Sequence, residues 1–100
     1  MAGVEKTRPD LTGLSLLVLD DDPGIVRSLE RVLSGLGAEV TRVGSLREAR
    51  AVLATIRPDA VLADLKLKDG TGLELLPAYL ARVPDGGFYV ITGHASVDSA

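Results

Sequence analysis

The sequence contains no cysteine and no tryptophan, and aromatic residues make up only 3% of its 100 positions. Without cysteine the chain has no disulfide framework, no thiolate zinc site and no thiol nucleophile. Because aromatic side chains are so scarce, a folded core must be built from aliphatic residues. Hydrophobic residues still make up 46% of the chain, a content that excludes a disordered protein.

Long apolar runs are also lacking. Stretches such as 16–19 fall far short of the roughly 20 apolar residues that cross a bilayer, and the N-terminus has no apolar signal region. We therefore expect no membrane contact and a cytoplasmic location. The net charge of −3 makes the chain a poor candidate for direct binding of nucleic acid.

The order of the residues predicts one small domain. Residues 1–13 are polar and without a period, and we expect them to form a flexible leader to a domain over 14–100. Short apolar segments alternate with amphipathic helical segments in this domain. This alternation predicts an α/β fold, a parallel sheet covered by helices on both faces. The expected strands are 14–19, 38–43, 60–63 and 88–91.

The starts of the helices carry local signals. Asp22 followed by Pro23 predicts an N-cap with proline at the first helical position. Ser45 and Glu48 have the spacing of a capping box before the second helix. Pro77 lies inside the third helical segment, expected from about residue 73, and predicts a late start or a kink there.

Polar groups follow three of the expected strands. Asp20 and Asp21 end the first strand, Asp64 ends the third, and Thr92 ends the fourth. Ligands of open parallel sheets bind at the carboxyl ends of the strands. Carboxylates that converge there repel one another unless protons or a cation neutralise them, and oxygen ligands suit Mg²⁺. The alternative is that these acids are only helix caps and solvated loop residues, which is our interpretation of Asp22.

These residues resemble the receiver domain of two-component response regulators. The resemblance covers residues 14–100 and is based on VLDDDPGIVRSL, PDAVLADLKLKDGTGLELL and VITGHASVDSA. The separations of 43 residues from Asp21 to Asp64 and 28 from Asp64 to Thr92 match the family's spacing. The part TGHASVDSA is similar to receivers of the nitrogen-regulation type, and DLKLKDGTGLELL is similar to those of the redox-response type. Their parent proteins carry a DNA-binding or AAA+ output domain.

The resemblance implies a role for each site residue. Asp64 is the expected phosphoacceptor, which takes the phosphoryl group from a sensor histidine kinase. Asp20 and Asp21 are the expected acidic pair that holds Mg²⁺, together with Asp64 and the backbone carbonyl of Lys66. The hydroxyl of Thr92 is expected to hydrogen-bond the phosphoryl group. Such a domain takes part in its own phosphotransfer and is not an enzyme with a separate substrate.

The resemblance also implies a flavodoxin-like, doubly wound sheet with strand order 2-1-3-4. The family's fifth strand, fifth helix and phosphoryl-contacting lysine would lie beyond position 100. We therefore expect a C-terminally truncated receiver with impaired phosphotransfer, which forms a homodimer or higher assembly through the exposed edge of its fourth strand.

Several other interpretations remain open. The chain could be a non-phosphorylated interaction module that keeps the receiver fold. A Mg²⁺-dependent hydrolase needs a second acid two residues after Asp64, where Lys66 stands. His94 is a weak candidate for a general base, and the side chain of Lys68, like that of Lys66, is expected to be solvated. We interpret the glycines at 70 and 72 as a turn that leads into a helix.

Overall fold

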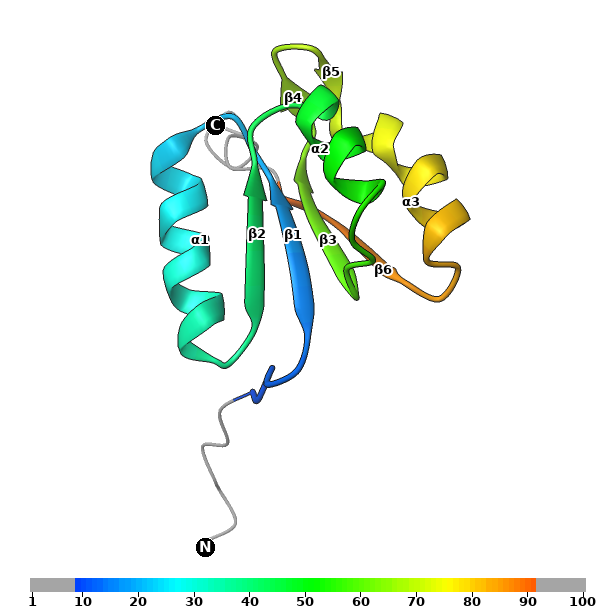
Figure 1. Ribbon diagram of the computed structural model, residues 1–100. Helices are drawn as coiled ribbons and strands as arrows, with labels where there is room; N and C mark the ends of the chain where they lie inside the picture. Colours follow the sequence, from blue (N-terminus) through cyan, green and yellow to red (C-terminus); the bar gives the residue numbers. More distant parts are fainter. Residues whose placement is uncertain (1–8, 92–100) are drawn as a thin grey trace, which may run out of the picture.

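The computed structural model describes residues 9–91 of the chain. Its centre is a parallel sheet of four strands in the order β2-β1-β3-β6 (Figure 1). This order confirms the predicted α/β class and flavodoxin-like topology, with β6 in the place of the expected fourth strand. The strands are β1 (Ser15–Leu19), β2 (Glu39–Val43), β3 (Ala60–Asp64) and β6 (Gly87–Ile91).

Three α-helices and one small hairpin connect these strands. In Figure 1, α1 lies on one side of the sheet, and α2 and α3 lie on the other side. The hairpin directly follows β3 and was not expected from the sequence, because its strands have only two residues each. The helices are α1 (Pro23–Gly35), α2 (Leu46–Leu53) and α3 (Leu76–Arg82), and the hairpin strands are β4 (Lys66–Leu67) and β5 (Gly70–Thr71).

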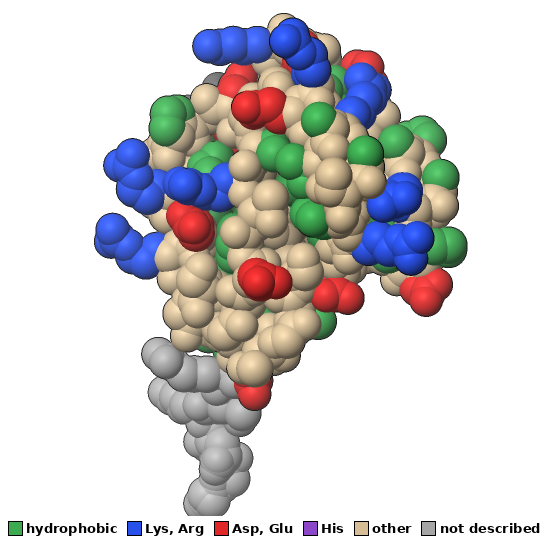
Figure 2. Space-filling view, viewed as in Figure 1, with side chains coloured by type: hydrophobic (Ala, Val, Ile, Leu, Met, Phe, Trp, Pro, Cys, Tyr) green, Lys and Arg blue, Asp and Glu red, His purple; other side chains and the backbone are tan. Residues whose placement is uncertain are grey.

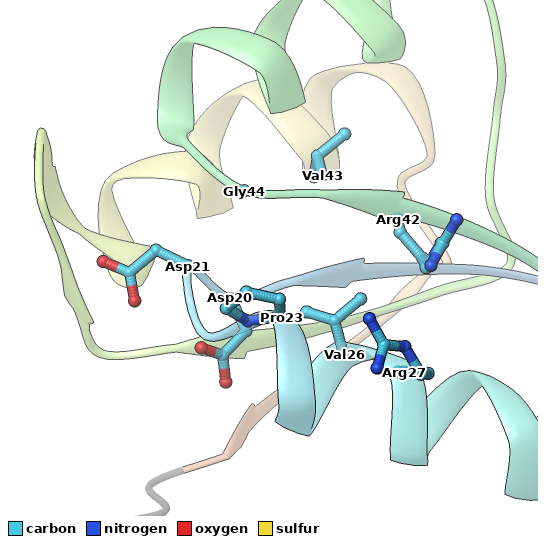
Figure 3. Close-up of a pocket in the computed structure, with 8 residues that line it drawn as sticks. All are labelled: Asp20, Asp21, Pro23, Val26, Arg27, Arg42, Val43 and Gly44. Atoms are coloured by element: carbon cyan, nitrogen blue, oxygen red, sulfur yellow. The ribbon is translucent and has the colours of Figure 1, made fainter.

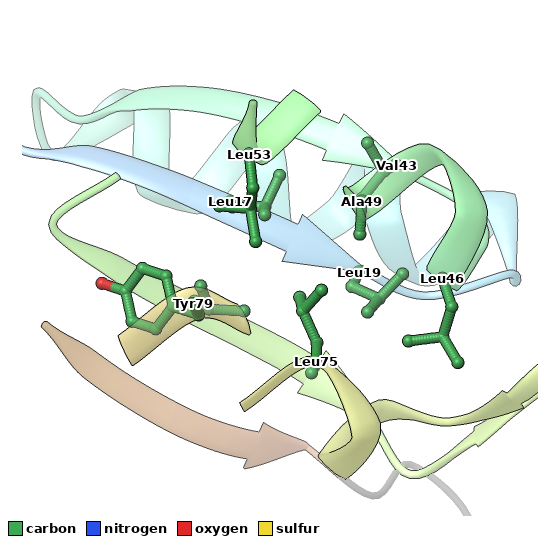
Figure 4. Packing of buried hydrophobic residues seen from close by; sticks show 10 residues of the cluster. Leu17, Leu19, Val43, Leu46, Ala49, Leu53, Leu75 and Tyr79 are labelled. Carbon is green, nitrogen blue, oxygen red and sulfur yellow. The ribbon is translucent and has the colours of Figure 1, made fainter. Parts of the chain in front are cut away.

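The main core fills the space between the sheet and the helices α2 and α3 (Figure 4). Tyr79 is its largest buried side chain, and its hydroxyl donates a hydrogen bond of 2.8 Å to the carbonyl oxygen of Pro58. The other buried members of the core are aliphatic, as the composition predicts, and the partly buried Phe88 packs against them. The buried members of the core are Leu17, Leu19, Val43, Leu46, Ala49, Leu53, Val61, Ala63, Leu75 and Tyr79.

The helices begin at the predicted signals. The Asp22 carboxylate accepts hydrogen bonds from the backbone N–H groups of Gly24 and Ile25, which confirms it as the cap of α1. At α2 the Ser45 hydroxyl accepts a bond from the Glu48 N–H group, as expected. The Glu48 carboxylate, however, accepts from the N–H group of Gly44 rather than from that of Ser45. The second bond of the capping box is therefore shifted by one residue.

The third helix starts late, as Pro77 predicts. A 3₁₀ turn, η1 (Gly72–Leu75), precedes α3, so that Pro77 falls in the first turn of the α-helix. A backbone N–H group in the first turn has no acceptor within the helix, and proline loses little by lacking one.

The segment before β1 touches the end of α1. The Leu11 N–H group donates a hydrogen bond of 2.8 Å to the carbonyl oxygen of Leu36.

Within residues 9–91, no helix combines the length and the apolar character that crossing a membrane requires.

Candidate metal centre

The carboxyl ends of two neighbouring strands bring three acids together. Asp20 and Asp21 follow β1, and Asp64 is the last residue of β3, which pairs directly with β1. Each acid offers one carboxylate oxygen to a group in which all the oxygens lie within 4.8 Å of one another. Separations of this size allow one cation to contact all three carboxylates.

The acidic group is held in place by the backbone around it. The N–H group of Asp20 donates to the carbonyl oxygen of Val43 in β2 at 3.1 Å. The Asp20 carboxylate accepts a bond of 2.9 Å from the N–H group of Asp22. Asp20 and Asp64 are only 4% and 5% exposed, so the surrounding chain packs closely around both side chains.

Burial and neighbouring negative charges both act on the Asp20 carboxyl. Burial raises the pKa of this carboxyl, the Asp22 N–H group partly opposes this rise, and the charges of Asp64, Asp21 and Asp22 add to it. Buried like charges are costly unless a cation offsets them. Because the ligand atoms are all oxygens, the donor set fits a hard divalent cation such as Mg²⁺.

The backbone beside Asp64 is tightly packed. The Gly72 N–H group donates to the carbonyl oxygen of Leu65 at 3.1 Å. A β-carbon at Gly72 would overlap the carbonyl oxygen of Asp64 and lie 3.1 Å from the Ala63 β-carbon. The expectation that this glycine only forms a turn before the helix is therefore incomplete. Gly72 is needed because the chain returns directly against the end of β3.

A cavity of about 280 Å³ borders the acidic group (Figure 3). Asp20 and Asp21 line one end of it, and Arg27 and Arg42 line the other, between α1 and β2. Arg42 also pairs with Glu30 at 3.3 Å. The sequence did not single out these arginines, because only the packing of α1 against β2 brings them to the site.

The hairpin after Asp64 adds basic charge at this end of the molecule. Its Lys66 and Lys68 side chains are exposed, and Figure 2 shows Lys and Arg side chains over the hairpin. The Lys66 N–H group lies 3.4 Å from a carboxylate oxygen of Asp64. The two lysine side chains are thus at the surface, as expected.

Two of the predicted site residues, Thr92 and His94, lie outside the described residues.

The sequence analysis did not identify Asp69 as a functional residue, because an Asp-Gly pair in a sequence indicates only a turn. In the structure its carboxylate accepts hydrogen bonds from the N–H groups of Leu46 and Arg47 at the start of α2.

Comparison with known proteins places this arrangement in a family. The profile described as "Response regulator receiver domain" matches residues 16–100. The chain therefore belongs to the response regulator receiver family.

Individual relatives agree with this assignment. The acid tolerance regulatory protein ActR of Rhizobium meliloti is 35% identical over 86 residues, which are 86% of this chain and 44% of ActR. The DNA-binding transcriptional regulator NtrC of Salmonella typhimurium is 36% identical over 83 residues, 83% of this chain and 18% of NtrC. The chain thus spans less than half the length of these relatives.

A solved structure shows the same fold. A response regulator from Burkholderia pseudomallei, with a phosphorylated aspartic acid, calcium ion and citrate, superposes with a TM-score of 0.75 and 28% identity. The match covers 80% of this chain and 47% of that one.

Proposed function

We propose that this receiver domain accepts a phosphoryl group on Asp64 from the phosphohistidine of a sensor kinase. A carboxylate oxygen of Asp64 attacks phosphorus, a P–O bond forms and the P–N bond breaks. The bonding electron pair stays on the imidazole of the kinase. The product is an acyl phosphate at the end of β3.

The single observation that supports this proposal best is the group of three carboxylate oxygens within 4.8 Å. We propose that Asp20, Asp21, Asp64 and the backbone carbonyl of Lys66 hold Mg²⁺. When bound, this ion supplies positive charge that offsets the repulsion between the carboxylates and the incoming phosphoryl group. A relative from Burkholderia pseudomallei carries a phosphorylated aspartate and a calcium ion, which is consistent with such chemistry.

The remaining roles belong to the same proposal. The Thr92 hydroxyl would donate a hydrogen bond to the acyl phosphate and report the modification to the surrounding loops. The kinase partner and a cytoplasmic location follow from the two-component class. NtrC, a relative, is a DNA-binding transcriptional regulator. We therefore propose that the parent protein carries an output domain that acts in transcription, of DNA-binding or AAA+ type.

Beryllofluoride tests the proposal without a kinase, since it mimics an acyl phosphate. With Mg²⁺ present, it is expected to shift the amide NMR signals of Asp64 and Thr92, while beryllofluoride without Mg²⁺ should leave them unchanged. If beryllofluoride leaves these NMR signals unchanged even at high Mg²⁺, the chain would instead be a non-phosphorylated interaction module.

We also propose that this polypeptide self-associates through β6. Among the described strands, β6 pairs only with β3, and Tyr89 and Val90 are 58% and 41% exposed. An unpaired apolar edge favours pairing with a second copy.

Light scattering at micromolar concentration is therefore expected to give a dimer or a larger assembly. Val90→Lys should shift the chain toward monomer, because a lysine on an edge strand opposes pairing. Leu80→Lys is the matched control: Leu80 is 38% exposed but lies on α3 and not on the strand. A monomeric wild-type chain would refute edge pairing.

A further inference from the structure

Asp69 joins two segments that are far apart in the sequence. It lies in the turn of the β4–β5 hairpin, and its carboxylate accepts bonds of 3.0 Å from the Leu46 N–H group and 3.1 Å from the Arg47 N–H group. Two of the N–H groups that α2 cannot satisfy internally therefore receive an acceptor from another part of the chain. These donors lower the pKa of the Asp69 carboxyl, so the acceptor is an anion at neutral pH.

The same hairpin is joined to Asp64 at its base. Lys66 pairs with Thr71, and Leu67 pairs with Gly70. The Lys66 N–H group lies 3.4 Å from the Asp64 carboxylate. A displacement of the hairpin turn would thus move the backbone of Lys66, two residues from Asp64.

The hairpin turn also packs against the first residue of α2. Gly70 has a φ of +145°, and a β-carbon there would lie 2.7 Å from the Leu46 side chain. Leu46 is itself only 1% exposed and belongs to the main core. The hairpin turn therefore contacts a buried core residue, and the Asp69 carboxylate adds a polar attachment to the start of α2.

The start of α2 is close to the acidic group as well. The loop between β2 and α2 passes Asp20: a β-carbon at Gly44 would lie 3.9 Å from the Asp20 carbonyl oxygen. Asp69 thus connects the two loops that flank the acids, the loop after β2 and the loop after β3.

We propose that Asp69 is a positioning residue, which holds the Lys66 backbone in place for the metal site and couples that site to the N-terminus of α2. The inference depends on the Mg²⁺ site of the proposed function. Coupling between two sites is reciprocal. Mg²⁺ should therefore slow hydrogen exchange at the Leu46 and Arg47 amides, and loss of the Asp69 carboxylate should weaken Mg²⁺ binding.

The experiment compares Mg²⁺ binding, followed by NMR, in the wild-type chain and in three variants. Asp69→Ala is expected to raise the Kd for Mg²⁺ by about 3- to 10-fold. Loss of a residue that hydrogen-bonds directly to a metal ligand usually raises a Kd by about 10-fold or more, and Asp69 acts less directly. Asp69→Asn keeps one acceptor oxygen and should give a smaller increase. Asp85→Ala removes an exposed acid at the opposite end of the sheet, before β6, and should leave the Kd unchanged.

Hydrogen exchange in the wild-type chain, compared with and without Mg²⁺, tests the coupling itself. In the wild-type chain, Mg²⁺ should slow exchange at Leu46 and Arg47; in Asp69→Ala, exchange there should be fast with and without Mg²⁺. Should Asp69→Ala fail to fold, Asp69→Asn gives the same comparison.

Two results would overturn the inference. Equal Mg²⁺ affinities in the wild-type chain and the Asp69 variants would refute the positioning role and leave the proposed function intact. A wild-type chain that binds no Mg²⁺ would refute the proposed function, and the inference with it.

Discussion

Asp64→Asn is expected to take up no phosphoryl group from acetyl phosphate at any Mg²⁺ concentration, whereas the wild-type chain is expected to be labelled when Mg²⁺ is present. The amide keeps the size of the carboxylate but is not a nucleophile toward phosphorus, so the variant tests the reacting atom and not the packing. The measurement is the mass of the intact protein after incubation with acetyl phosphate. Equal labelling of the two chains would place the phosphoacceptor elsewhere.

Asp20→Asn is the matched control, because it changes a buried acid of the same group and leaves the nucleophile in place. Its labelling should require about 10- to 100-fold more Mg²⁺ and recover when Mg²⁺ is raised.

The Asp20→Asn variant should also have a higher free energy of unfolding than the wild-type chain at pH 7 without Mg²⁺. Since the folded protein raises the pKa of Asp20 above its usual 3.8, the ionised form of this acid opposes folding at neutral pH. Urea unfolding should show this gain shrinking as the pH falls toward 4.

Gly72→Ala is expected to lower the free energy of unfolding by about 2 kcal/mol. The added methyl group would overlap the carbonyl oxygen of Asp64. To relieve this overlap the backbone at the end of β3 must shift, and that shift disturbs its pairing with β6. Alanine also lowers the conformational entropy of the unfolded chain, which stabilises the folded protein by about 0.4–1 kcal/mol. This gain is smaller than the cost of the overlap. The midpoint of thermal unfolding should fall by roughly 10 °C.

Gly35→Ala separates this overlap from the general effect of replacing glycine. Gly35 is the last residue of α1, and a β-carbon there would meet no atom within 4 Å. The control should be neutral or slightly stabilising in urea unfolding. If Gly72→Ala is as stable as Gly35→Ala, the close approach to Asp64 has no energetic weight.

Most of the fold was predictable because its signals are local. The alternation of apolar and amphipathic segments predicts the parallel sheet, and the Asp22-Pro23 pair and Pro77 define where α1 and α3 begin. The hairpin was missed for the opposite reason. Its strands are held by Asp69, which caps a helix more than 20 residues away, and by Gly72, which packs against Asp64.

The acidic group was predictable because strand order determines which strand ends are neighbours. Once β1 and β3 are adjacent, Asp20, Asp21 and Asp64 must share one edge of the sheet. Arg27 and Arg42 were not predictable, since their place in the cavity depends on how α1 packs against β2. Local sequence carries no signal for that packing.

The central position of β1 has a consequence for synthesis of the chain. This strand pairs with β2 on one side and β3 on the other, so its apolar residues leave the ribosome before either partner exists. At about 5–20 residues per second, several seconds pass before β3 emerges. During that interval the segment SLLVL is uncovered, and chaperone contact with the nascent chain should be strongest there.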